Sequence, residues 1–172
     1  MARALIVGRF QPYHLGHHEA VKKILAEVDE LIIVIGSAQE SYQKKNPFTA
    51  GERIEMISRA LKKEKLFEKC FIVPVPDVNE NALWTKRIKA YCPRFDVVYS
   101  NNPLVMELFN SAGVKVKKMV SNHAEIESVK VRKSMAEGKD WRSLVPKVVA
   151  DYLDEIKAEK RIESILKEEK KE

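Results

Sequence analysis

Short aliphatic runs alternate along this chain with longer segments in which apolar residues recur at helical spacing. The predicted strands are residues 4–7, 31–36, 71–75, 95–99 and 114–116. The run at 31–35 is apolar at every position, which is typical of a parallel strand covered on both faces. The alternation predicts an α/β fold: a doubly wound parallel sheet of the Rossmann-like kind that is followed by C-terminal helices.

The C-terminal part of the chain has a helical pattern. Val149, Leu153 and Ile156 form an apolar stripe after Pro146, whereas the last third of this segment is dominated by lysine and glutamate. We therefore predict one long helix from Pro146 to the end, fraying at its tip. A length of 172 residues suits one domain, 1–172, with a helical extension over about 146–172. The extension is a candidate contact with another subunit.

The composition, 45% hydrophobic and 33% charged, is that of a soluble globular protein. The longest aliphatic run, residues 31–35, is too short to cross a bilayer, and no signal-peptide pattern opens the chain. We therefore expect a cytoplasmic protein with no membrane partner. Cys70 and Cys92 lie far apart, with no C-x-x-C and no histidine at ligand spacing, which predicts buried thiols and no metal held by the protein.

The formal net charge of +6 indicates an anionic partner. Nucleic acid and a nucleotide are the two candidates. The 31 basic residues are spread among 25 acidic ones, and neither a zinc finger nor an aromatic-rich RNA-binding motif is present in the sequence. A small phosphorylated substrate fits this pattern better than nucleic acid.

Residues 8–17, Gly-Arg-Phe-Gln-Pro-Tyr-His-Leu-Gly-His, join the first predicted strand to the first predicted helix. A helix start offers unpaired N–H groups and a positive dipole end, and Arg9 adds a permanent cation. His14 and His17 are three residues apart, hence on one face of the helix. Gly16 leaves room for a group to approach the first helical turn. This segment is the predicted phosphate site.

His-x-Gly-His directly after a first strand resembles the signature of the nucleotidyltransferase superfamily, and the ten-residue form resembles the archaeal type of nicotinamide-nucleotide adenylyltransferase. The resemblance covers roughly residues 3–163. Gly8 is expected to turn sharply where the strand ends. His18 lies outside the motif spacing and is read as a solvated or capping residue.

The loop after the second strand continues the resemblance. Ser37 follows that strand, and Lys45 stands where the family carries a basic residue that acts on the triphosphate; a lysine in a loop is otherwise usually solvated. Thr49 and Glu52 have the form of a capping box at the start of the next helix. Arg53 either points from that first turn toward the loop or is an ordinary surface arginine.

Asn81 and Trp84 follow the third strand, three residues apart. Tryptophan can stack on a ring, and asparagine can both donate and accept hydrogen bonds. The segment that carries these two residues resembles the part of the family that holds the nicotinamide ring and its carboxamide. The alternative is that Trp84 is a core residue. Pro74 within the third strand argues against a central position in the sheet.

Residues 126–132 occupy the place of the superfamily's second signature. Ser128 is predicted to cap a helix there and Arg132 to grip phosphates. Glu127 and Val129 replace residues that are usually small or hydroxylated. Earlier in the chain, Asn102 matches the family, whereas Asn101 replaces a usual glycine and is expected to tolerate the same left-handed backbone.

The resemblance implies transfer of AMP from ATP to nicotinamide mononucleotide (NMN), giving NAD and pyrophosphate, with Mg²⁺ carried on the ATP. The residues expected to act in catalysis are Arg9, His14, His17, Lys45 and Arg132. The residues expected to bind substrate are Gly8, Phe10, Gln11, Gly16, Ser37, Asn81, Trp84, Asn102 and Ser128. A homo-oligomer is also implied. The alternatives are another adenylyltransferase of this superfamily, for phosphopantetheine or a flavin nucleotide, and a non-catalytic nucleotide sensor.

Overall fold

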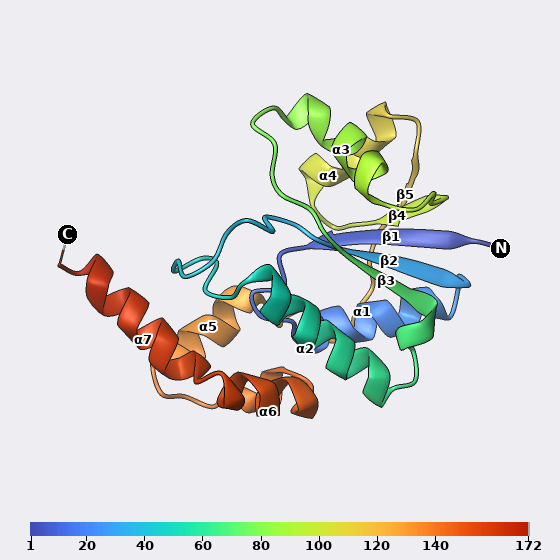
Figure 1. The fold of residues 1–172 in the computed structure, drawn as a ribbon. Coiled ribbons are helices and arrows are strands. Elements are labelled where there is room, and N and C mark those ends of the chain that lie inside the picture. The colour runs from blue at the N-terminus through green and yellow to red at the C-terminus, as the bar shows by residue number, and fades with distance from the viewer. Residues whose placement is uncertain (172) are drawn as a thin grey trace.

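The computed structural model describes residues 1–171 and shows a five-stranded sheet with helices on both faces (Figure 1). The strand order is β3-β2-β1-β4-β5, and every neighbouring pair is parallel. The strands are β1 Arg3–Gly8, β2 Glu30–Ile35, β3 Cys70–Pro74, β4 Val97–Tyr99 and β5 Lys115–Lys117. The predicted doubly wound parallel sheet is confirmed.

Seven α-helices and three short 3₁₀ helices are present in residues 1–171. The α-helices are α1 Leu15–Leu25, α2 Ala50–Lys63, α3 Trp84–Tyr91, α4 Pro103–Ser111, α5 Ser128–Ala136, α6 Lys147–Glu155 and α7 Ala158–Glu169. The 3₁₀ helices are Phe67–Lys69, Asn81–Leu83 and Arg142–Leu144. Within these described residues, no helix is both long enough and apolar enough to cross a membrane.

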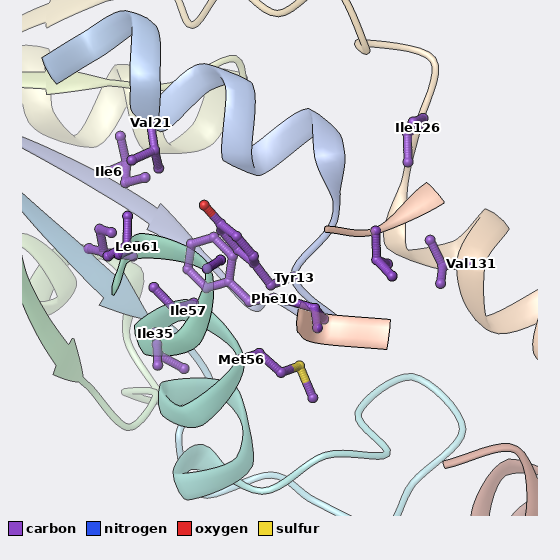
Figure 2. Close-up of a cluster of buried hydrophobic side chains, with 14 of the residues drawn as sticks. Ile6, Phe10, Tyr13, Val21, Ile35, Met56, Ile57, Leu61, Ile126 and Val131 are labelled. Atoms are coloured by element: carbon purple, nitrogen blue, oxygen red, sulfur yellow. The ribbon is translucent and has the colours of Figure 1, made fainter. Parts of the chain in front are cut away.

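The sheet separates the core into two clusters of buried side chains, one on each of its faces. Helices α3 and α4 cover one face, where Ile88 and Phe109 are fully buried, while α1, α2 and the C-terminal helices lie on the other (Figure 1). The larger cluster lies on this second face, and Phe10 and Tyr13 from the β1–α1 loop insert into it beside Met56 and Ile57 (Figure 2). The loop that carries the histidine motif is therefore anchored by its own aromatic side chains.

The strand order places this loop at the topological switch point of the sheet. The chain leaves β1 to build β2 and β3 on one side, and β4 and β5 lie on the other side. Open α/β sheets bind ligands in the crevice that forms at this point, beyond the carboxyl ends of the strands. Pro74 lies in β3, which is an edge strand, as its missing N–H group predicts.

The prediction of one long C-terminal helix is wrong. The chain forms two helices, α6 and α7, and it changes direction at Lys157, whose φ is 55°. The turn buries Ala158 and Ile162 against the larger cluster, so that α7 lies against α5 (Figure 1). Burial of apolar side chains outweighs the cost of one left-handed residue.

Candidate active site

His14 and His17 cap helix α1 with each other. His14 is the N-cap residue, and the N–H group of His17 donates to its Nδ1 at 3.4 Å. The N–H group of His14 in turn donates to Nδ1 of His17 at 3.3 Å. The rings stack with centroids 3.6 Å apart. Because both Nδ1 atoms accept, each neutral ring carries its proton on Nε2, where it is available to an anion.

Both imidazoles are neutral at pH 7. Burial lowers the pKa of His14 to about 4. Burial also lowers the pKa of His17 well below its ordinary value, and the proximity of His14 adds to this. The pair therefore offers hydrogen-bond donors to a phosphate, while the full positive charges come from elsewhere in the site.

The two glycines of the motif make room for protein groups. A Cβ on Gly16 would lie 2.9 Å from Cε1 of His14 and 3.0 Å from the carbonyl oxygen of His123. A side chain at Gly16 would therefore collide with the His14 ring, while the predicted approach of a phosphate to this turn stays a prediction. A Cβ on Gly8 would lie 2.9 Å from the Phe10 ring, and the left-handed turn falls on Phe10, with φ 52°, instead of on Gly8.

Phe10 and Gln11 are buried and hold the loop in place. The Phe10 ring meets the His17 ring edge-on, with centroids 4.7 Å apart. The Gln11 side chain donates to the carbonyl of Phe48 and accepts from its N–H group, both at 2.9 Å. These two bonds engage one N–H group and the oxygen of the amide, so that Gln11 positions the 37–48 loop, and its role in substrate binding stays a prediction.

Arg9, Lys45 and Arg132 line one cavity of about 570 Å³, as their predicted shared role requires. We call it the cationic cavity; its other lining residues are Lys44, Pro47, Val129, Lys133, Ala136, Ile162, Ile165 and Leu166. Arg132 donates to the carbonyl of Gln11 at 2.8 Å, and Arg9 to the side chain of Asn46 at 3.4 Å. Burial lowers the pKa of Arg132, and the nearby positive charge of Arg9 adds to this shift.

The start of α5 differs from the prediction. Glu127 is the N-cap residue and makes no side-chain cap, while Ser128 is the first residue inside the helix. The hydroxyl of Ser128 donates to the carbonyl of Pro12 at 3.0 Å, which ties the second signature to the first. Val129 is exposed in the wall of the cationic cavity. The sequence departure at Val129 therefore lies in that cavity.

Arg53 is fully buried, so its alternative reading as a surface residue is wrong. Its guanidinium donates at 2.9–3.3 Å to five main-chain carbonyls, those of Arg9, Gly36, Ser37, Glu40 and Thr49. Burial, followed by the charge of Arg9, lowers its pKa to about 10. Arg53 thus joins the loop after β1 to the loop after β2.

A second cavity, of about 160 Å³, lies on the Gly16 side of the histidine pair. Its lining includes His14, Gly16, His17, Asn101, Met119, Ser121, His123 and Ile126. Glu19 was missed in the sequence: its carboxylate accepts from the hydroxyl of Ser121 and from the N–H groups of Asn122 and His123, at 2.8–3.1 Å. Only the folded chain brings these residues together, since they are more than 100 positions apart.

The remaining predicted substrate-binding residues line neither cavity. The Ser37 carbonyl accepts from Arg53, and the Asn102 side chain caps α4. Asn81 is exposed in a 3₁₀ helix. Trp84 is half-buried and meets Phe109 edge-on at 5.5 Å between ring centroids, so its role at the nicotinamide ring stays a prediction.

Two neighbouring expectations are corrected. His18 is neither solvated nor a cap: it is buried, its Nδ1 lies 3.0 Å from the Tyr13 hydroxyl, and its Nε2 lies 3.6 Å from Glu64. The backbone of Asn101 is not left-handed. Its side chain donates to the carbonyl of Met119 at 2.9 Å and accepts from the N–H group of Met119 at 3.0 Å. His18 is buried and Asn101 is held by contacts with a distant segment, and local sequence reveals neither.

Known proteins share the sequence and the fold of this chain. The family model described as cytidylyltransferase-like matches residues 5–164. The nicotinamide-nucleotide adenylyltransferase of Archaeoglobus fulgidus is 51% identical over 168 residues, covering 95% of this chain and 97% of that protein. The protein of the same name from Methanothrix thermoacetophila is 49% identical over 98% of this chain and 99% of its own length.

The fold is also found in a bifunctional NMN adenylyltransferase/ADP ribose pyrophosphatase from Francisella tularensis, solved with AMP and a manganese ion. Its TM-score is 0.76 at 18% identity, and the match covers 98% of this chain and 53% of that one. Sequence identity near one half along nearly the whole chain is decisive. This chain belongs to the cytidylyltransferase-like family of nucleotidyltransferases, among the members named nicotinamide-nucleotide adenylyltransferase.

Proposed function

We propose that this protein transfers the adenylyl group of ATP to NMN, giving NAD and pyrophosphate. The observation that carries the proposal is the joint placement of Arg9, Lys45 and Arg132 in one cavity, which Arg132 and Ser128 tie to the loop that carries the two neutral imidazoles through the carbonyls of Gln11 and Pro12. Cations suit the β- and γ-phosphates, and neutral donors suit the α-phosphate, which carries less charge.

The chain's residues act mainly by placement. A phosphate oxygen of NMN forms a bond to the α-phosphorus of ATP, and the bond from that phosphorus to the bridging oxygen breaks, which releases pyrophosphate. The attacking phosphate is already an anion, so no general base is required. Nε2–H of His14 and of His17 donates to the α-phosphate as its charge redistributes, while the cationic cavity neutralises the leaving pyrophosphate.

We assign the divalent cation to the substrate, as Mg²⁺ bound to ATP. In residues 1–171, no group of three or more histidine, cysteine, aspartate or glutamate side chains is arranged to hold a metal ion. The phosphate oxygens supply the hard ligands that Mg²⁺ prefers, and water completes its coordination.

The acceptor side of the site is assigned to Asn81 and Trp84. Both follow β3, so they lie beyond the carboxyl edge of the same sheet as the histidine motif. Their role with the nicotinamide ring rests on the sequence resemblance. A cytoplasmic homo-oligomer completes the proposal.

The test is release of pyrophosphate from Mg·ATP with NMN, phosphopantetheine or flavin mononucleotide as acceptor, beside a calorimetric titration with ATP. Of the three acceptors, we expect only NMN to give pyrophosphate release, together with formation of NAD. Pyrophosphate release with phosphopantetheine or flavin mononucleotide, and none with NMN, would show that the acceptor is not NMN. Binding of ATP without release from any acceptor would indicate a nucleotide sensor.

A further inference from the structure

Helix α7 contacts the 42–48 loop, which carries Lys45. From this contact we infer that Arg161 is a positioning residue, which fixes Lys45 in the cationic cavity and thereby sets the affinity for the pyrophosphate part of ATP. Arg161 lines no part of either cavity described above. Its neighbour in the chain, Ile162, does line the cationic cavity. The identity of the anion rests on the proposed function.

Arg161 is anchored by a forked ion pair with Glu52. Nη1 and Nη2 of Arg161 lie 2.6 and 2.7 Å from the two carboxylate oxygens of Glu52, and both side chains are 15% exposed. Glu52 also accepts from the N–H group of Thr49 at 2.9 Å, completing the capping box of α2. Two parallel charge-assisted hydrogen bonds with little solvent access hold the guanidinium in one orientation.

From this anchor, Arg161 contacts both sides of Lys45 in the chain. Its Nη1 donates to the carbonyl of Pro47 at 3.3 Å, and its guanidinium lies over the Tyr42 ring at 4.6 Å from the centroid. A weaker second tie joins Lys44 to Glu169 of α7 at 3.5 Å. Lys45 is exposed and lies between these attachment points.

The consequence is specific to phosphate affinity. Gln11 and Arg53 hold other parts of this loop, whereas Arg161 holds the stretch next to Lys45, so the lysine loses less conformational entropy when it engages the anion than it would without that contact. The histidine pair is held separately, by its own cap and by the Phe10 and Tyr13 rings. Because Lys45 would meet the pyrophosphate part already in bound ATP, removing Arg161 should weaken binding of ATP and pyrophosphate with little effect on kcat.

The test compares Arg161→Ala with Arg59→Ala. Arg59 makes a similar forked pair with Glu155, at 2.9 and 3.2 Å, and lies over the Tyr152 ring at 4.6 Å, but it does not contact the 42–48 loop. We expect Arg161→Ala to raise KM for ATP and the calorimetric Kd for pyrophosphate about tenfold, the equivalent of about 1.4 kcal/mol. KM for NMN and kcat should stay within about twofold. Arg59→Ala should leave all four constants unchanged.

A double-mutant cycle with Lys45→Ala decides whether Arg161 acts through Lys45. In the Lys45→Ala background, Arg161→Ala should have little further effect on the pyrophosphate Kd. Additive losses, or equal losses in Arg161→Ala and Arg59→Ala, would overturn the inference. Should Arg161→Ala not fold, Arg161→Lys keeps the charge without the fork, and the same selective rise in Kd is expected on a smaller scale.

Pyrophosphate binding is measured without turnover, so this result is separable from the proposed function. A wild-type protein that releases no pyrophosphate from ATP and NMN would contradict the proposed reaction. The dependence of pyrophosphate affinity on Arg161 would still support or overturn the positioning role.

Discussion

His14 and His17 each have two tasks, since the ring atoms that cap α1 leave the opposite atoms for the substrate. Nδ1 of each ring accepts from the main chain, and this contact fixes the direction of Nε2. Orientation of the donors is therefore built into the start of the helix, and no separate carboxylate is needed to select the tautomer.

Gly16→Ala tests how tightly this pair is placed. The added methyl group would lie 2.9 Å from the His14 ring and 3.0 Å from a main-chain carbonyl, so the ring must shift. We expect kcat to fall and the free energy of unfolding to drop by about 1–3 kcal/mol. Gly51→Ala is the matched control, because its nearest foreign atom would be 3.9 Å away within α2.

For Gly51→Ala we expect unchanged turnover and a gain in stability of about 0.5–1 kcal/mol, as for glycine replacement within a helix. Steady-state kinetics and urea unfolding of both variants provide the measurement. Wild-type turnover in Gly16→Ala would show that the His14 ring does not depend on this gap.

Several residues of the site were predictable and others were not, for one physical reason. His14, His17, Arg9 and Arg132 occur in short motifs, and local spacing alone brings the histidines together. The roles of Arg53, Glu19 and Arg161 depend on carbonyls, hydroxyls and carboxylates from distant segments. When the partners of a buried arginine are main-chain atoms, no residue pattern in the sequence distinguishes it from an exposed arginine.

At the scale of elements, the start of α5 brings an apolar side chain into the cationic cavity. Val129→Thr adds a hydroxyl there, at a side chain that is 59% exposed. We expect KM for ATP to fall by up to about tenfold, since a hydrogen bond to a charged group stabilises by about 1.5–3 kcal/mol before solvent competition. KM for NMN should change little. Val120→Thr, 64% exposed and outside both cavities, is the control, and equal effects of the two would contradict this prediction.

The break between α6 and α7 had no sequence signal, because Lys157 takes the left-handed conformation without glycine or proline nearby. Lys157→Gly should raise the melting temperature, since it removes strain of about 1–2 kcal/mol, part of which is offset by entropy in the unfolded chain. Glu163→Gly, on the exposed face of α7, should lower stability by about 1 kcal/mol. Calorimetric scans of both variants check the pair. A loss of stability in Lys157→Gly would refute the strain argument.

For the whole molecule, the buried histidines couple folding to pH. Burial sets the pKa of His14 at about 4 in the folded protein, below its ordinary value of 6.5. Between these values the unfolded chain binds a proton that the folded chain does not. We therefore expect the free energy of unfolding to decrease as the pH falls from 6.5 to 4, by on the order of 3 kcal/mol for His14.

Urea unfolding at a series of pH values, without nucleotide, measures this dependence. His14→Asn keeps a capping side chain but has no group that titrates in this range, so its pH dependence should be shallower. His17 contributes in the same direction and remains in the variant. Identical slopes for wild type and His14→Asn would exclude His14 as a source.

The edges of the sheet bear on how copies of this chain can meet. Pro74 in β3 has no N–H group, and β5 has only three residues, of which Lys115 and Lys117 are exposed. Proline and lysine on short edge strands oppose pairing with a foreign strand. If the protein forms the proposed homo-oligomer, we expect it to assemble through helices and loops, and the same two edges oppose uncontrolled growth into β-aggregates.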